Sequence, residues 1–397
     1  MEKLLEKSNK SIQSVQYPFQ RDVIGRINWD WRMNGIIGAR GTGKTTLLLQ
    51  KLQQFRKEGH EVIYVRLDDL YFADHRIYDL ADTFRKNGGE YLYMDEVHKY
   101  SGWAREFKNI YDSIPELKLV FSGSSIIELT KQDADLSRRA LMYEMTGLSF
   151  REYLLMADII SLPACPLIEI FRDHVETASG IIKKIPVLKH FSSYLKSGFY
   201  PYFLEPDRDY FTTLEQIIRT VMETDLRFIE NFDIAQSKKM LTLLKVIAAS
   251  VPFKPNISKI SKKTDLHRQT VLQYFQYLEK ARMIKLVNQP EKYISRLQKP
   301  DKIFLNNPNL FYALNPEMVD TGNLRETFAL NQLSANHEVF LHEKADFLVD
   351  NKFVIEIGGK NKDNRQIRDF DNSFVFLDDI EIGHHNRIPL WLLGFLY

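Results

Sequence analysis

The stretch GIIGARGTGKTTLLLQKLQQF, residues 35–55, decides the fold of the first part of this 397-residue chain. Residues 35–37 form a short apolar run that is typical of a buried strand, and residues 45–56 have the pattern of a helix. Between them, residues 38–45 fit the pattern G-x-x-x-x-G-K-[ST] in full. A strand, a glycine-rich loop and a helix in this order predict a loop that binds phosphate groups.

The residue types in this loop suit that task. Gly38, Gly41 and Gly43 let backbone N–H groups approach phosphate oxygens without a Cβ atom in the way. Lys44 supplies a positive charge for the β and γ phosphates, and the hydroxyl of Thr45 is a ligand for Mg²⁺. The sequence therefore predicts that ATP and Mg²⁺ bind here.

Short apolar runs alternate with helical patterns over residues 17–150. This alternation favours a parallel sheet with helices on both faces. The sequence therefore predicts an α/β P-loop NTPase core in this region. The elements expected after the loop alternate strand and helix: residues 61–67 (EVIYVRL), 78–85, 90–94 (EYLYM), 103–111 and 117–121 (LKLVF).

Two carboxylates follow the expected strand YLYM. Asp95 would order the ligand shell of Mg²⁺, and Glu96 would act as the base that activates the attacking water. A second acid in this position distinguishes hydrolysis of ATP from binding alone. Asp68 and Asp69 also follow a strand and are a rival pair, which we rank lower.

Polar and basic residues after the next strand are further candidates for catalysis. Ser124, with Ser122 as the alternative, would contact the γ-phosphate or the water. Arg138 or Arg139 would stabilise charge in the transition state, either in its own site or in that of a neighbouring subunit. The second arrangement would require a homo-oligomer, and the sequence leaves both open. A solvated basic pair is the simpler interpretation of the two arginines.

Three further regions follow the core. Residues 151–240 are helical and rich in large apolar residues, as in a helical lid or linker. Residues 241–300 have the order helix, short helix, turn, helix, strand. Residues 303–397 mix strands with a helix that carries Glu326, and residues 388–397 are expected to form a buried terminal strand.

The region 254–302 is basic, with 12 Lys and Arg against 4 Asp and Glu in a chain of formal net charge +2. Residues 241–287 resemble a winged helix-turn-helix, with residues 268–280 as the recognition helix and residues 283–287 as the start of the wing. DNA is the partner that this pattern favours, and a module that only packs against the core is the alternative. Six residues near that helix would contact DNA: Lys259, Lys262, Lys263, His267, Arg268 and Gln269.

Asp346 and Glu356 lie on two strands that a short turn connects, so both carboxylates could hold a second Mg²⁺. Asp, hairpin, Glu-x-Lys is the arrangement of a large nuclease superfamily. Gly358 stands where its lysine is expected, and Lys360 or Lys362 would have to take that place. The sequence leaves open an active nuclease and a degenerate core retained for structure.

The composition of the chain indicates its cellular compartment. Cys165 is the only cysteine, which excludes an internal disulfide and favours a reducing compartment, the cytoplasm. No apolar stretch reaches the length needed to span a membrane. Residues 1–10 are charged and lack the apolar segment of a secretory signal.

Several motifs together resemble the prokaryotic AAA-type ATPases that combine an AAA_14 domain with a C-terminal DUF4143 domain. The segment SFREYL is the most specific of them, since the phosphate loop is shared by many superfamilies. The matching pieces are IIGARGTGKTTLL (36–48), YLYMDEVHKY (91–100), LVFSGSS (119–125), LSRRALMYEMTGLSFREYL (136–154), DFLV (346–349) and VIEIGGK (354–360).

The resemblance implies an ATPase core, a helical lid, a winged helix and a small α/β domain of the restriction-endonuclease type. It also implies that Asp95 and Glu96 carry hydrolysis and that Arg139 is the active arginine. It assigns the nucleotide contact to nine consecutive residues: Gly38, Ala39, Arg40, Gly41, Thr42, Gly43, Lys44, Thr45 and Thr46.

The leading hypothesis is an ATP-driven molecular switch that acts on nucleic acid, in which nucleotide binds one arrangement of the domains more tightly than another. One alternative is an ATP-dependent nuclease that uses Asp346 and Glu356. Another is a signalling or scaffold ATPase whose basic region holds a protein partner.

Overall fold

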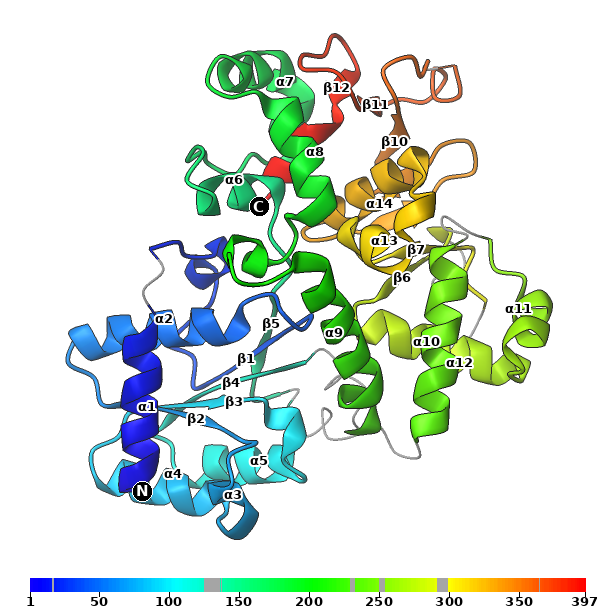
Figure 1. The fold of residues 1–397 in the computed structure, drawn as a ribbon. Coiled ribbons are helices and arrows are strands. Elements are labelled where there is room, and N and C mark those ends of the chain that lie inside the picture. Colours follow the sequence, from blue (N-terminus) through cyan, green and yellow to red (C-terminus); the bar gives the residue numbers. More distant parts are fainter. Residues whose placement is uncertain are drawn as a thin grey trace. The chain divides into compact units, whose positions relative to one another are not determined.

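The computed structural model describes residues 1–15, 18–124, 136, 138–228, 233–249, 254–290, 299–363 and 365–397. The chain forms two compact units (Figure 1). The first unit contains Met1–Thr146 and Glu223–Asp233, and the second contains Gly147–Met222 and Ile234–Tyr397. The chain therefore leaves the first unit, returns to it for a short segment, and then enters the second unit again.

A five-stranded parallel sheet is the centre of the first unit, in the order β2-β3-β4-β1-β5. This confirms the predicted α/β class with a parallel sheet. The strands are β1 (Met33–Gly38), β2 (Val62–Arg66), β3 (Tyr91–Asp95), β4 (Lys118–Ser124) and β5 (Leu141–Glu144). Each predicted strand of this core lies within a few residues of the observed one.

Alternation along the strands divides the apolar side chains between the two faces of the sheet. In β3, Tyr91 and Tyr93 pack with the helix α2 (Lys44–Lys57), whereas Leu92 and Met94 pack in the cluster on the other face. That cluster is covered by α4 (Ile77–Lys86) and α5 (Trp103–Ser113), with the short α3 (Tyr71–Asp74) nearby (Figure 1). Helices therefore lie on both faces, as predicted.

The helix α1 (Glu2–Ser14) crosses the edge strand β2. Leu4 packs with the apolar cluster on one face of the sheet and Ile12 with the cluster on the other. Between them, the hydroxyl of Ser8 accepts a hydrogen bond of 2.9 Å from the backbone N–H of Tyr64 in β2. The helix thus covers an edge that would otherwise present unpaired backbone groups.

The second unit begins with helices: α6 (Phe150–Met156), α7 (Leu167–Ile182), α8 (Val187–Ser197) and α9 (Tyr210–Glu223). Ser149 and Glu152 form a capping box at the start of α6. The Ser149 hydroxyl also donates to the carbonyl oxygen of Tyr397 at 2.6 Å, and Arg151 Nε donates to the same oxygen at 3.0 Å. The SFREYL segment therefore joins two parts of the chain that lie 246 to 248 positions apart.

Three helices and a two-stranded antiparallel sheet follow in the order predicted for residues 241–300. They are α10 (Ile234–Ala248), α11 (Ile257–Thr264), α12 (Arg268–Lys280), β6 (Ile284–Val287) and β7 (Lys302–Leu305). The expected recognition helix, residues 268–280, coincides with α12. Residues 291–298 of the basic region lie outside the described residues.

The C-terminal part contains a mixed sheet in the order β12-β11-β10-β9-β8, with α14 (Thr321–Leu333) packed against β10. β9 (Phe347–Val349) and β10 (Phe353–Gly358) form the predicted antiparallel hairpin. The other strands are β8 (Val339–Leu341), β11 (Ser373–Leu377) and β12 (Arg387–Pro389), and α13 (Asn309–Leu314) precedes α14.

The terminal strand predicted for residues 388–397 is wrong. Only Ile388 and Pro389 belong to a strand, and Leu390–Phe395 form a 3₁₀ helix, η9, in which every residue is buried. An apolar run that is buried on all sides has no polar face to reveal its period, so the sequence predicts its burial but not its conformation. Among the described residues, we find no helix with the length and apolar character needed to span a membrane.

Candidate functional site

The loop between β1 and α2 has a backbone that requires its glycines. Gly41 and Gly43 have φ angles of 84° and 94°, in the left-handed region that other residues rarely adopt. A Cβ atom on Gly38 would overlap the carbonyl oxygen of Met145 on the neighbouring chain segment. The loop therefore keeps its shape through backbone conformation and close packing, and it ends at the N-terminus of α2 at Lys44.

Lys44 folds back over this loop. Its Nζ atom donates to the carbonyl oxygens of Gly38 and Ala39 at 2.9 and 2.7 Å. Burial lowers the pKa of Lys44, although the charges of Glu96, Asp95 and Asp225 act in the opposite direction. The three carboxylates thus help to keep this ammonium group charged, which binding of a phosphate in the loop requires.

Arg21 supports the loop, and sequence reasoning missed it. Its guanidinium donates to the carbonyl oxygen of Thr42 at 3.1 Å and to that of Thr146 at 2.9 Å, and its side chain is buried. The hydroxyl of Thr42 in turn donates to the carbonyl oxygen of Ala39 at 2.9 Å. These contacts come from residues far apart in the chain, which no local pattern reveals.

Asp95 is buried at the end of β3 and accepts four hydrogen bonds. Its Oδ2 atom accepts from the hydroxyls of Thr45 at 2.6 Å and Tyr64 at 2.9 Å. Its Oδ1 atom accepts from the Ser122 hydroxyl and from the Glu96 backbone N–H. Burial and the charge of Asp95 raise the pKa of Tyr64, which keeps this phenol a donor. The structure thus brings Thr45 and Asp95 together, as a shared magnesium ion requires.

Two serines of β4 lie at different places relative to the loop. Ser122, the alternative choice from the sequence, is the serine that hydrogen-bonds Asp95. Ser124, the first choice, is paired in register with Gly38, the first residue of the loop. Both side chains are buried. Ser124 is therefore close to where phosphate would bind, and Ser122 orients the acid.

Glu96 directly follows β3 in a left-handed conformation, with φ 55°. Its side chain is 22% exposed, and its Oε2 atom is 3.4 Å from Nε2 of His98. The rival pair is engaged elsewhere: Asp68 forms ion pairs with Arg66 and Lys99, and Asp69 pairs with Lys7. The geometry favours Asp95 and Glu96 over the rival pair.

Arg139 lies at the wrong end of the sheet to reach its own phosphate loop. It precedes Leu141, which pairs with Asn34 near the start of β1, whereas the loop begins at Gly38 at the other end of that strand. Four residues of strand separate these levels by roughly 13 Å. The Arg139 guanidinium donates to both carboxylate oxygens of Asp112 at 3.0 Å. Of the two arrangements left open by the sequence, this conformation does not favour the one in which Arg139 acts in its own site, and a role towards a neighbouring subunit stays a prediction.

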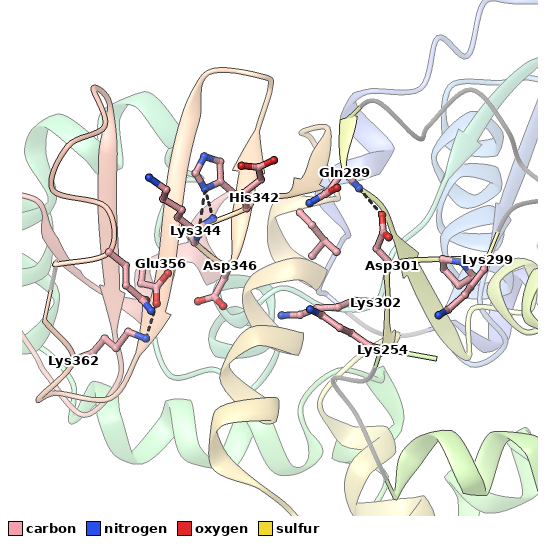
Figure 2. Close-up of a pocket in the computed structure, with 15 residues that line it drawn as sticks. Lys254, Gln289, Lys299, Asp301, Lys302, His342, Lys344, Asp346, Glu356 and Lys362 are labelled. Carbon is pink, nitrogen blue, oxygen red and sulfur yellow. Dashed lines mark hydrogen bonds and ion pairs between the residues drawn. The ribbon is translucent and has the colours of Figure 1, made fainter. Parts of the chain in front are cut away.

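A second candidate site is a cavity of about 890 Å³ in the second unit (Figure 2). Five lysines contribute to its lining: Lys254, Lys299, Lys302, Lys344 and Lys362. The carboxylates Asp346 and Glu356 face the same cavity. Asp301 and Glu343 also contribute to the lining, so the site combines five lysines with four acids, which is a suitable environment for a bound anion beside a cation.

Lys362 takes the position that the sequence left empty at Gly358. A Cβ atom on Gly358 would overlap the Cβ and Cγ atoms of Lys362, so the lysine side chain fills that space. Its Nζ atom forms an ion pair of 2.5 Å with Glu356 Oε1, as Figure 2 shows. Lys360, the other candidate, is exposed. The structure thus selects Lys362.

Asp346 and Glu356 in this cavity lie close to Glu326 on α14, and all three carboxyl groups are partly or fully buried. Asp346 Oδ2 accepts from the Ile357 backbone N–H at 2.8 Å, and Glu356 is 2% exposed. Among the described residues, no donor reaches Glu356 Oε2. Burial, together with the charge of Asp346, raises the pKa of Glu326 on α14 to about 7. Burial likewise raises the pKa values of Asp346 and Glu356.

No group of three or more His, Cys, Asp or Glu side chains in the described parts of the chain is arranged to hold a metal ion. Asp346, Glu356 and Lys362 are the groups in this cavity that correspond to the predicted nuclease arrangement. The six basic and polar residues expected to contact DNA, on α11 and at the start of α12, are all exposed: Lys259, Lys262, Lys263, His267, Arg268 and Gln269.

Comparison with known proteins finds a family match that covers most of the first unit. Residues 30–154 match the family model AAA_14, described as an AAA domain. The parallel sheet and the glycine loop define a P-loop NTPase fold, and the matched part of this fold is similar to AAA domains. Residues 188–321 match a different domain of unknown function, DUF8612, rather than the expected DUF4143.

One relative is the uncharacterized protein MJ1637 of Methanocaldococcus jannaschii, which is 23% identical over an alignment of 315 residues that covers 76% of this chain. The chain spans 66% of that relative's length. Similar solved structures include the replication initiator DnaA bound to AMPPCP and single-stranded DNA, with 14% identity, coverage of 69% and 86% of the two chains, and a TM-score of 0.31.

AMPPCP-bound DnaA from Aquifex aeolicus has 15% identity, coverage of 66% of this chain and 86% of that chain, and a TM-score of 0.27. Both TM-scores are low, and the fold assignment rests on the order and direction of the strands.

Proposed function

We propose that this protein binds and hydrolyses ATP with Mg²⁺ at the loop of residues 38–46. The observation that carries the proposal is the contact between Thr45 and Asp95, with Glu96 next in the chain and Lys44 folded over the loop. A phosphate loop joined to an acidic strand end in this way is the arrangement of P-loop ATPases.

The residues present fit a nucleotide and its metal ion. Replacing the carbonyl oxygens of Gly38 and Ala39 by phosphate oxygens would give the Lys44 ammonium anionic partners. Thr45 and Asp95 would hold Mg²⁺, which when bound neutralises charge on the β and γ phosphates.

Glu96 is the residue best placed to accept a proton. Its carboxylate is partly exposed beside the loop, whereas Asp95 is buried and already accepts four hydrogen bonds. Ser124, in register with Gly38, would contact the terminal phosphate or the attacking water. The roles therefore divide into orientation of the metal by Asp95 and activation of water by Glu96.

The test compares the wild-type protein with Glu96→Gln. The wild type should release phosphate from ATP only when Mg²⁺ is present. Glu96→Gln should bind ATP with similar affinity but hydrolyse it at least about 10²-fold more slowly, because the amide cannot accept the proton. An unchanged rate in Glu96→Gln would show that Glu96 is not the base.

A second function, cleavage of nucleic acid, is favoured by one observation: Lys362 fills the space at Gly358 and pairs with Glu356. The lysine that the sequence appeared to lack thus comes from four positions further along the chain. Asp346 and Glu356 would hold a divalent ion, Lys362 would steady the attacking water, and the lysine rim would attract the phosphate backbone.

Incubation of single-stranded and duplex DNA with Mg²⁺ or Mn²⁺ tests this function. The wild type should cut the substrate and Glu356→Ala should not, while Lys344→Ala, which changes the rim but no carboxylate, should weaken binding only. A wild type that leaves all substrates intact under these conditions contradicts an active nuclease.

We propose further that the exposed basic residues of α11 and α12 form a winged-helix surface for DNA and that ATP acts as the switch ligand. Binding to random duplex DNA should then weaken steeply as salt rises, because phosphate contacts release counterions. Binding that does not change with salt would favour a protein partner and a scaffold role.

A further inference from the structure

A buried ion-pair cluster lies beside the phosphate loop and is not explained by the roles above. Asp225 is at its centre, on the short helix η6 (Asp225–Phe228). Its Oδ1 and Oδ2 atoms accept from Arg40 Nη1 at 3.0 and 3.2 Å, and Arg40 is a residue of the loop itself. Its Oδ1 atom is also 3.7 Å from Nε2 of His98.

The two innermost side chains of the cluster are removed from solvent. Those of Asp225 and His98 are fully buried, whereas that of Arg40 is 29% exposed. Burial alone would raise the pKa of Asp225, but the nearby imidazole of His98 and the charge of Arg40 outweigh it and lower the pKa. Asp225 is therefore a buried anion whose charge is balanced by one residue of the loop and one residue next to the acidic pair.

His98 connects this anion to Glu96. The same ring nitrogen, Nε2, is 3.4 Å from Glu96 Oε2 and 3.7 Å from Asp225 Oδ1. Because one ring nitrogen carries at most one proton, it can donate fully to only one of the two carboxylates at a time. The position of Asp225 thus affects how firmly His98 holds Glu96.

The position of Asp225 in the chain links this cluster to the helix α9. Asp225 belongs to the segment Glu223–Asp233, which is part of the first unit, while the residues before it form α9 (Tyr210–Glu223), most of which is part of the second unit. The chain runs from that helix directly into η6. A displacement of Asp225 would consequently be passed along the backbone to α9.

We infer that Asp225 is a positioning residue that couples the phosphate loop to the water-activating acid: it holds Arg40 on one side and, through His98, Glu96 on the other. This inference rests on the proposed ATPase function. A triphosphate in the loop competes with Asp225 for Arg40 and so changes the position of Asp225, and His98 passes this change to Glu96, whose carboxylate it holds in the orientation needed to activate water. The same displacement of Asp225 also moves the segment Glu223–Asp233 and is passed from there to α9.

Three variants test the coupling by steady-state kinetics and equilibrium binding of ATP. Asp225→Asn should lower kcat by about 10²-fold, as expected for a misplaced catalytic group, without weakening ATP binding. His98→Ala should behave in the same way. His98→Gln keeps an N–H donor at the level of Nε2 and should retain most of kcat. Asp82→Asn, which removes an exposed carboxylate that pairs with Lys86 on α4, is the matched control and should change nothing.

A structural readout separates coupling from a purely packing role. Hydrogen exchange of the backbone N–H groups of residues 214–228 should change when a non-hydrolysable ATP analogue is added to the wild type. The change should be absent in Arg40→Gln, even at analogue concentrations that saturate its loop. Thermal unfolding of each variant establishes that it is folded.

The outcomes distinguish the two proposals. A wild type that neither binds nor hydrolyses ATP overturns the ATPase function and the coupling with it. A wild type that hydrolyses ATP, together with His98→Ala and Asp225→Asn variants that keep its kcat, overturns the coupling alone. Equal losses in His98→Gln and His98→Ala also contradict it, because a retained donor should rescue a positioning role.

Discussion

At the scale of the residue, Lys44 donates to the carbonyl oxygens of its own loop. From this contact we predict how loss of the lysine changes the affinity for ATP. Lys44→Ala should weaken the binding of ATP by about 10- to 100-fold, because a charged hydrogen bond contributes about 1.5–3 kcal/mol. Calorimetric titration with ATP and Mg²⁺ measures the change. Lys57→Ala, at the exposed far end of α2, should bind like the wild type.

A second prediction at this scale separates Lys362 from Lys360. Lys362→Ala removes the partner of buried Glu356 and should abolish metal-dependent cleavage of nucleic acid. Lys360→Ala removes an exposed side chain and should leave cleavage nearly unchanged. Gel assays with equal amounts of protein compare the two. Equal effects of both substitutions would mean that the Lys362 contact has no part in the chemistry.

The individual residues also show what a sequence can and cannot reveal. Lys44, Thr45 and Asp95 follow from local motifs, and the structure brings them together. Asp225 lies 185 positions from its partner Arg40, so no local pattern identifies it. Lys362 was one of two alternatives, because the sequence shows a missing side chain at Gly358 but not which neighbour fills the space.

At the scale of the element, the start of α6 has two functions. Ser149 caps the helix and also binds the carbonyl oxygen of Tyr397. Ser149→Ala should therefore lower the free energy of unfolding by about 1–2 kcal/mol, measured by urea denaturation. Ser193→Ala, which removes an exposed hydroxyl from α8, should change it by less than about 0.5 kcal/mol.

Helices and strands whose apolar residues recur with a clear period were predicted well, and those without such a period were not. Four strands of the first sheet and α12 were found within a few residues of their expected bounds, whereas the edge strand β5 (Leu141–Glu144) was not predicted. Leu390–Phe395 were expected to be extended but form a 3₁₀ helix, since their uniform burial removes the polar positions that define a period. The placement of Arg139 depends on strand order, which the alternation of elements does not specify.

At the scale of the whole molecule, Glu326 makes stability depend on pH. Its pKa of about 7 in the folded protein lies above that of an unfolded glutamate, about 4.3, so the folded state binds this proton more tightly. Its contribution to stability is complete below about pH 4 and is lost as pH rises through 7. Glu326→Gln should therefore gain up to about 3 kcal/mol relative to the wild type between pH 4 and 8.

Urea denaturation of both proteins at several pH values measures this difference. Comparison with Glu326→Gln removes the contribution of the other titrating groups, apart from those coupled to Glu326. Two curves of unfolding free energy against pH that run parallel would contradict a raised pKa at this site.

The hydroxyl of Ser8 on α1, which accepts the backbone N–H of Tyr64, has a consequence for assembly. With α1 in place, a strand from another molecule is kept from extending the sheet beside β2. The opposite border, β5, carries the half-exposed Leu141 and Met142. Edge-to-edge pairing that involves this sheet should therefore begin at β5, and it should stop at a dimer, because each molecule then offers no second open edge.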